Sequence, residues 1–196
     1  MRTKICGITS YKGAMLAIDA GVDALGFIFY AKSPRYISVK QAKEIIEKLP
    51  PFIEKVGLFV NETAQTINET AKATGITLIQ LHFETDQTLQ DALDYPFIEV
   101  IRAKSAEDIS KLDSSRYYLV DAYCESYGGS GKRLNLEWFD NQDNSHIILA
   151  GGLTPDNLSE IKNYGFYGVD VSSGTESKPG EKDPQKVRDF VANAKT

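Results

Sequence analysis

The chain has 196 residues, of which 42% are hydrophobic and 25% charged, and its formal net charge is -5 at pH 7. This is the composition of an ordinary soluble protein, not of a disordered chain. No run approaches the roughly 18 apolar residues of a membrane span, and without a basic cluster nucleic acid is not expected as the main partner.

Short apolar runs alternate with longer segments of helical period along the whole chain. Strands are expected at residues 3–6, 24–29, 55–60, 77–81, 97–101, 117–121, 147–150 and 168–171. Helices are expected at 11–20, 39–49, 63–74, 86–93 and 106–112, near Leu136, and at 155–163 and 184–194. This alternation indicates βαβ units and a parallel sheet.

Capping residues support several of these boundaries. Thr154 and Asp183 each precede a proline, which is the arrangement expected at a helix N-terminus. Gly21, Gly75 and Gly165 each follow a periodic run, where a left-handed helix end is expected.

The predicted sheet can either close into a barrel or stay open and doubly wound. A dinucleotide-binding open sheet needs a glycine fingerprint after its first strand, but that strand ends in Cys6-Gly7-Ile8-Thr9. We therefore predict a single-domain (βα)8 TIM barrel over residues 1–196, compact beside the ~250 residues typical of that fold. The N-terminal segment lacks a secretory pattern, so a cytoplasmic location is expected.

In such barrels the active site lies at the C-terminal ends of the strands, often with phosphate bound after the seventh and eighth. The seventh predicted strand is followed by Gly151 and Gly152, and the eighth by Ser172, Ser173 and Gly174. Small residues let backbone N–H groups approach an anion closely. Each loop could also be only a tight turn, but two of them at the two expected positions favour a phosphate site.

Two strand ends carry candidate acid/base groups. Cys6 ends the first strand, where it is either a small buried hydrophobe or a thiolate base. Asp121 ends the sixth, where it is either a turn residue or an acid. These strands lie well apart around a barrel, so the two groups could face each other across a substrate.

Other polar residues follow the second and fourth strands. Arg35, in a loop restrained by Pro34, is either solvated or a binding group for a carboxylate or phosphate. Gln80 and His82 share one face of their strand, and His82 is either a proton carrier or a structural histidine.

A glycine-rich segment follows the sixth strand. It resembles a P-loop but has Ser126 where the motif needs glycine and Arg133 where it needs Ser or Thr. We predict a lid over the substrate, with a solvated loop as the alternative. The lid residues are Gly128, Gly129, Ser130, Gly131 and Lys132.

The cysteines, Cys6 and Cys124, have no metal-ligand spacing. Free thiols are expected, with a disulfide between them as the less favoured alternative. A monomer is slightly favoured over a homodimer, because no large apolar helix face lacks a partner.

Several segments together resemble phosphoribosylanthranilate isomerase, in that family's order, from residue 3 to about residue 181. The matching segments are KICGIT at 4–9, GFIF at 26–29, SPRY at 33–36, VGLFVN at 56–61, QLH at 80–82, GGSGK at 128–132, AGGLTP at 150–155 and GVDVSSGTE at 168–176. The shared order and spacing carry the resemblance, because no single motif would suffice.

The resemblance implies an Amadori rearrangement in tryptophan biosynthesis, without cofactor or metal. N-(5'-phosphoribosyl)anthranilate would become 1-(2-carboxyphenylamino)-1-deoxyribulose 5-phosphate. Cys6 would be the general base, Asp121 the general acid and Arg35 the partner of the anthranilate carboxylate, while the two small-residue loops would hold phosphate. The other expected substrate contacts are Gln80, His82 and Asp170.

The chain departs from the family pattern at two places. Phe83 stands where glycine usually follows the QLH segment, and residues 133–135 continue the glycine-rich loop differently. The alternatives are a histidine-pathway isomerase, which would place aspartate at Cys6, indole-glycerol-phosphate synthase, which needs a catalytic Lys and Glu not found here, and a non-catalytic phospholigand-binding barrel.

Overall fold

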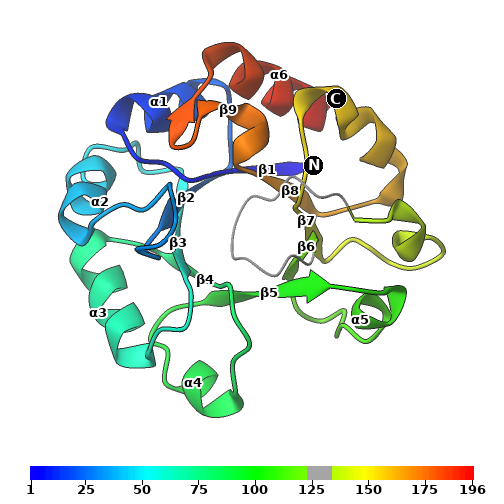
Figure 1. The fold of residues 1–196 in the computed structure, drawn as a ribbon, viewed down its shortest axis with the longest axis horizontal. Coiled ribbons are helices and arrows are strands. Elements are labelled where there is room, and N and C mark those ends of the chain that lie inside the picture. The colour runs from blue at the N-terminus through cyan, green and yellow to red at the C-terminus, as the bar shows by residue number, and fades with distance from the viewer. Residues whose placement is uncertain (123–133) are drawn as a thin grey trace.

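In the computed structural model, which describes residues 1–122 and 134–196, parallel strands close into a barrel (Figure 1). The ring closes where β1 (Arg2–Cys6) pairs with β8 (Gly168–Val171). The strands between them are β2 (Ala24–Ile28), β3 (Glu54–Phe59), β4 (Leu78–Leu81), β5 (Phe97–Ala103), β6 (Tyr118–Ala122) and β7 (Ile147–Leu149). The predicted (βα)8 barrel is confirmed, and the open sheet is wrong.

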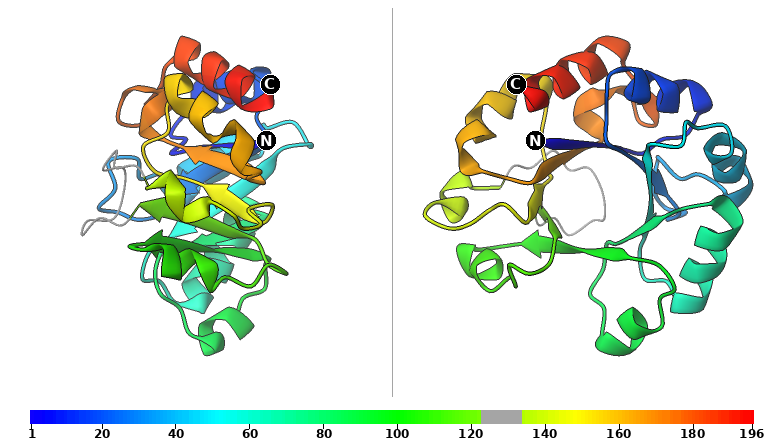
Figure 2. Two further views of the ribbon diagram at one scale, coloured as in Figure 1. Left: turned by 90° about the vertical axis from the view of Figure 1, so that its right-hand side faces the viewer. Right: turned by 180° about the vertical axis from the view of Figure 1, so that it is seen from behind.

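Helices form an outer ring around the strands (Figure 2). The α-helices are α1 (Tyr11–Asp19), α2 (Val39–Ile46), α3 (Ala64–Thr74), α4 (Gln87–Asp91), α5 (Ala106–Ser110) and α6 (Pro184–Lys195). The segments before β7 and before β8 are instead 3₁₀ helices, η1 (Leu136–Phe139) and η2 (Pro155–Tyr164). Both predicted positions are therefore confirmed, and only the helix type differs.

The capping residues act as the sequence predicted. Asp183 accepts hydrogen bonds from the first-turn N–H groups of Gln185 and Lys186, each at 2.9 Å. Gly75 ends α3 at φ 80° and Gly165 ends η2 at φ 74°, left-handed values that favour glycine. These caps fix where the strands begin and so where the site residues fall.

The main core lies between the barrel and its helices, and includes the fully buried Phe27, Phe59 and Phe190. Smaller apolar clusters fill the barrel interior, for example Leu119 with Val100. Successive residues of a strand point alternately to these two regions. Every second strand residue therefore faces the interior, including Lys4 and Cys6 of β1.

One small element was not predicted. After β8 comes a short 3₁₀ helix, η3 (Ser173–Thr175), and then an antiparallel hairpin, β9 (Glu176–Lys178) and β10 (Glu181–Lys182). Strands of two or three residues are too short to show the two-residue alternation by which a strand is predicted from sequence. The turn between them contains Gly180 at φ 82°. The hairpin folds back toward the end of β1, where Lys182 donates to the Cys6 carbonyl.

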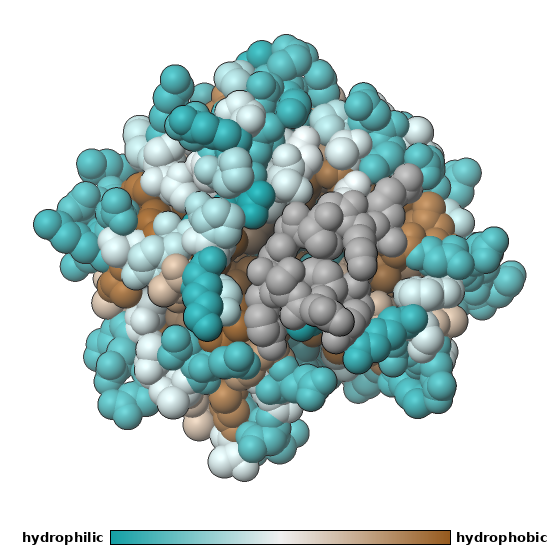
Figure 3. Space-filling view, in the orientation of Figure 1, coloured by the Kyte–Doolittle hydropathy of each residue, from teal (hydrophilic) through white to brown (hydrophobic). Residues whose placement is uncertain are grey.

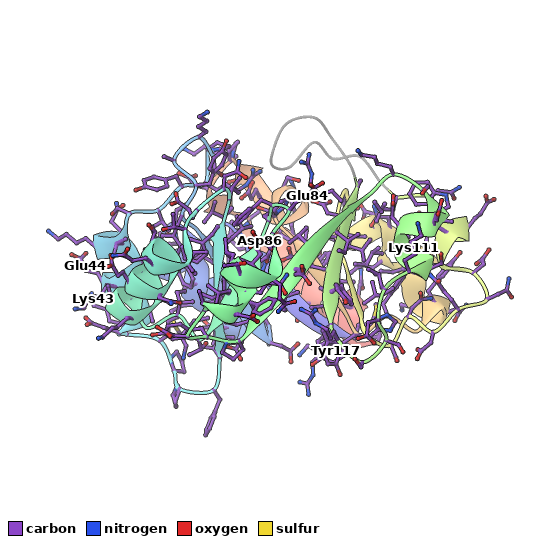
Figure 4. The ribbon with its side chains drawn as sticks, turned by 90° about the horizontal axis from the view of Figure 1, so that it is seen from below. Lys43, Glu44, Glu84, Asp86, Lys111 and Tyr117 are labelled. Carbon is purple, nitrogen blue, oxygen red and sulfur yellow. The ribbon has the colours of Figure 1, made fainter. Side chains whose placement is uncertain are left out.

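The barrel has two distinct ends (Figure 4). Glu84, which follows β4, lies at one end, and Tyr117, which precedes β6, lies at the other. Seen from the C-terminal end, hydrophilic residues project around most of the periphery, and hydrophobic surface shows in patches between and inside them (Figure 3). No helix in the described part of the chain is long and apolar enough to cross a membrane.

Candidate active site

A cluster of buried polar residues occupies the C-terminal half of the barrel interior. The strand registers place Asp170 opposite Lys4, and Asp121 opposite Arg102. Alternation along each strand directs these side chains to the same interior. The structure therefore brings together Cys6, Gln80, His82, Asp121 and Asp170, all named from the sequence.

Lys4 and Arg102 belong to the same cluster, and sequence reasoning missed both. Lys4 Nζ donates to Asp170 Oδ1 at 2.9 Å, with side-chain exposures of 8% and 10%. A buried ion pair of this kind is costly to assemble, because both charges lose their water. The signal available in the sequence was the two-residue period that puts Lys4 on the face of Cys6.

Cys6 is a buried free thiol. Burial raises its pKa above the ordinary value, the nearby Lys4 ammonium opposes that rise, and the carboxylate of Asp170 adds to it. A buried thiol of this kind keeps its proton unless positive charge stabilises the thiolate. Cys124, the other half of the considered disulfide, lies outside the described residues.

Asp121 is the opposite case, a carboxyl whose proton is held more tightly than usual. Burial raises its pKa to about 6, and the negative charge of Asp170 adds to the rise. The Ala122 N–H, which donates to Oδ1 at 2.8 Å, and the positive charge of Arg102 oppose it. A carboxyl with this pKa is partly protonated near neutral pH, which suits a general acid.

His82 and Gln80 line the cluster at the end of β4. Burial lowers the pKa of His82 to about 4, with the positive charges of Arg102 and Lys4 adding to the effect. The imidazole is therefore neutral at pH 7, which favours a hydrogen-bonding role over proton carriage. Gln80 is 2% exposed, and Phe83, the departure from the family pattern, packs partly buried against the core.

Arg35 is buried rather than solvated, and its guanidinium meets Glu176 of the hairpin. Nε and Nη2 donate to the carboxylate at 2.7 to 3.0 Å, and Lys182 Nζ donates to the same group at 3.0 Å. Burial alone would raise the pKa of Glu176, but these donors outweigh it and the pKa lies below its ordinary value. The Arg35 stem packs on Gly7, where a Cβ would lie 2.6 Å from Arg35 Cδ.

The two predicted phosphate loops adjoin one another. Gly151 and Gly152 have φ 86° and 64°, and neither N–H donates to a described residue. A methyl group on Gly174 would overlap the carbonyl oxygen of Leu153, so glycine permits the contact between the loops. Ser172 Oγ donates to the Cys6 carbonyl at 3.1 Å, which ties the second loop to the end of β1.

The predicted lid residues Gly128, Gly129, Ser130, Gly131 and Lys132 lie outside the described residues. Within residues 1–122 and 134–196, no group of three or more His, Cys, Asp or Glu side chains could hold a metal ion.

Comparison with known proteins identifies the family. Residues 3–193 match the sequence model of N-(5'phosphoribosyl)anthranilate (PRA) isomerase. The chain belongs to this family. Its isomerase activity and its place in tryptophan biosynthesis follow, and the resemblance drawn from the motifs is confirmed.

Individual relatives agree over their full length. The N-(5'-phosphoribosyl)anthranilate isomerase of Sulfurovum sp. (strain NBC37-1) is 60% identical over 196 residues, covering 100% of both chains. The crystal structure of phosphoribosyl anthranilate isomerase from Thermotoga maritima is 37% identical, with a TM-score of 0.88 and coverage of 100% of this chain and 98% of that one. A further isomerase structure, in complex with reduced 1-(o-carboxyphenylamino)-1-deoxyribulose 5-phosphate, is 36% identical with a TM-score of 0.85 and the same coverage.

Proposed function

We propose that Cys6 and Asp121 are the base and the acid with which this isomerase converts N-(5'-phosphoribosyl)anthranilate into 1-(2-carboxyphenylamino)-1-deoxyribulose 5-phosphate. The observation that carries the proposal is Asp121, which burial holds at a pKa of about 6 in the same polar cluster as a buried thiol. Two groups with separated titrations, one giving and one taking a proton, are what the reaction requires.

The chemistry assigns one proton transfer to each group. Asp121 protonates the ribose ring oxygen, so the ring opens and the anthranilate nitrogen, which keeps its hydrogen, forms a protonated imine with C1. The Cys6 thiolate then removes the proton from C2, which gives an enolamine. Moving the enol hydroxyl proton to C1 yields the ketone, so the atoms balance and no redox partner is needed.

Binding is assigned to groups around this pair. The loops that contain Gly151, Gly152 and Gly174 are proposed to hold the phosphate, because the N–H groups of Gly151 and Gly152 donate to no described residue and glycine turns commonly bind anions in this way. The related structure that holds a phosphorylated product analogue supports a phosphate site in this fold. Arg35 is proposed to pair with the anthranilate carboxylate through Nη1, which donates to no described residue while Glu176 holds the other side of the guanidinium.

The remaining substrate contacts are proposals of the same kind. Gln80 and the neutral His82 would donate or accept hydrogen bonds, and Asp170 would act on the substrate from beside Lys4. The lid assignment of residues 128–132 stays a prediction, as do the single domain and the cytoplasmic location.

The oligomeric state has two candidates. The sequence slightly favours a monomer, whereas Phe52, between α2 and β3, is 101% exposed, and the N-terminal end of the barrel holds an apolar well of about 530 Å³. A further crystal structure, 34% identical, contains monomers generated from the dimeric phosphoribosylanthranilate isomerase of Thermotoga maritima. Analytical ultracentrifugation of the wild type and of Phe52→Ser distinguishes the two states. A monomeric wild type supports the monomer. A dimeric wild type that becomes monomeric in Phe52→Ser overturns the monomer and places Phe52 in the interface.

The assignment of the pair is tested by following the loss of substrate fluorescence with purified enzyme and freshly made substrate. Cys6→Ala and Asp121→Asn should each lower kcat by about 10²- to 10⁴-fold. Asp113→Asn, an exposed aspartate before β6, serves as the matched control and should keep wild-type activity. Treatment with a chelator should change nothing. Wild-type turnover by either folded variant would overturn the assignment.

A further inference from the structure

To act as a base, Cys6 must carry a negative charge in a buried place, and Asp121 cannot stabilise that charge. The thiol is 4% exposed, and burial favours its neutral form over the thiolate. Positive charge near the sulfur must offset that cost. Two ammonium groups come close to Cys6, Lys4 within β1 and Lys182 from β10.

The donors of Lys182 are all committed elsewhere. Its Nζ donates to the Cys6 carbonyl at 2.6 Å, to the Ser172 carbonyl at 3.2 Å and to Glu176 Oε1 at 3.0 Å. An ammonium has three N–H groups, so none is left for a thiolate. Lys182 therefore secures the backbone at the end of β1 and balances the charge of Glu176.

Lys4 is placed differently, because it shares the inner face of β1 with the Cys6 side chain. A Cβ built on Gly26, the register partner of Cys6 in β2, would lie 2.7 Å from Cys6 Sγ and 3.1 Å from Lys4 Nζ. The sulfur and the ammonium thus converge on one point that only glycine leaves open. Among the described residues, Asp170 is the carboxylate that pairs with Nζ. Nζ therefore keeps N–H groups for a second anion, and a hydrogen bond between Lys4 and Cys6 contributes to the pKa shifts of both groups.

We propose that Lys4 is a positioning residue, whose ammonium is shared between the Asp170 carboxylate and the Cys6 thiolate, so that the thiolate forms beside a fixed positive charge. The inference rests on the proposed role of Cys6 as the base. Asp170 disfavours the Cys6 thiolate, because its carboxylate competes for the Lys4 ammonium and repels a second negative charge. The Lys4 and Asp170 pair therefore sets how readily Cys6 loses its proton.

The charged groups around the sulfur agree with this division. Lys4 and Lys182 each lower the pKa of Cys6, and Asp170 raises it. Conversely, the negative charges of Asp170 and of the Cys6 thiolate each raise the pKa of Lys4, against the effect of burial. Asp121, on β6, also faces this group: the negative charge of Asp170 raises its pKa, and the positive charges of Arg102 and Lys4 lower it.

The test measures the titration of Cys6 directly, in the full-length enzyme with Cys124→Ser as background. Iodoacetamide alkylation is followed against pH: the midpoint reports the thiol pKa, and the plateau at high pH reports access to the sulfur. Lys4→Met should raise the midpoint by about one unit, which slows alkylation at pH 7 about tenfold. Asp170→Asn should lower the midpoint, and the double variant should return toward wild type. Arg2→Met, which removes an exposed charge from the same strand, is the matched control and should change nothing.

The outcomes separate this inference from the proposed function. A midpoint unchanged in Lys4→Met, or shifted in the same direction by Lys4→Met and Asp170→Asn, would overturn it. If Lys4→Met unfolds because Asp170 loses its partner, the double variant and Asp170→Asn still decide the sign. Full turnover by Cys6→Ala would instead refute Cys6 as the base, and the alkylation midpoints would still report whether Lys4 governs the thiol.

Discussion

The two ends of the barrel handle charge in opposite ways. At the C-terminal end the ion pairs around the site are buried: the side chains of Lys182 and Glu176 are 1% and 4% exposed. At the N-terminal end the pairs face water, as with Arg2, whose side chain is 66% exposed, and the well between the strands is lined largely by apolar residues such as Ile98 and Ile148. Buried charge costs stability, so its confinement to one end marks where the chemistry takes place.

The largest effect on stability is expected at the centre of the buried charges. Glu176→Gln removes the carboxylate that holds Arg35 and Lys182, and leaves two buried cations without a counter-charge. We expect a loss of about 3–5 kcal/mol in the free energy of unfolding, measured by urea denaturation.

The matched variant at the other end is Arg116→Met, which breaks the partly exposed pair with Glu99 at 3.1 Å. It should cost only ~0.5 kcal/mol, as solvent-screened pairs do. Equal losses in the two variants would mean that the two ends do not differ energetically.

A smaller effect of opposite sign is expected at Asp121. Its folded pKa of about 6 lies above the ordinary 3.8, so the carboxyl supports folding below pH 4 and loses that contribution as the pH rises through 6. Asp121→Asn cannot ionise and should be more stable than wild type by about 2–3 kcal/mol at pH 7, with the difference vanishing near pH 4. Thermal unfolding at both pH values measures this. If the stability gained by Asp121→Asn over the wild type were the same at pH 7 as at pH 4, the raised pKa of Asp121 would be contradicted.

The same titration shapes the pH dependence of turnover. Because Asp121 acts in its protonated form and Cys6 as the thiolate, kcat/KM should rise with pH up to about 6, where Asp121 begins to ionise. Above 6 the loss of protonated Asp121 is offset by thiolate formation, so the profile should stay level up to the higher pKa of Cys6 and then fall. Lys4→Met should therefore lower the level part of the profile and displace the falling limb toward higher pH. A structural role for Lys4 would lower stability and leave the falling limb where it was.

Much of the fold and part of the site could be predicted from local patterns. The strand ends predicted that Cys6 and Asp121 lie at the active-site end, because a polar residue that ends an apolar strand has a defined place in a barrel. Arg35 was found too, but its buried ion pair was not, since its partner lies 141 residues away. Lys4 was missed because a lysine within a short strand looks like a solvated residue until the neighbouring strands enclose it.

The sequence by itself determined the alternation of strands and helices, their caps and the rim on which the chemistry lies, because these depend on periodicity and on residues near in the chain. Only the tertiary structure decided which charges meet. Lys182 reaches the Cys6 carbonyl across 176 residues, and Lys4 reaches Asp170 across 166. These contacts exist only once the barrel has closed and removed the water around them, and that same desolvation raises the pKa of Asp121 and of Cys6.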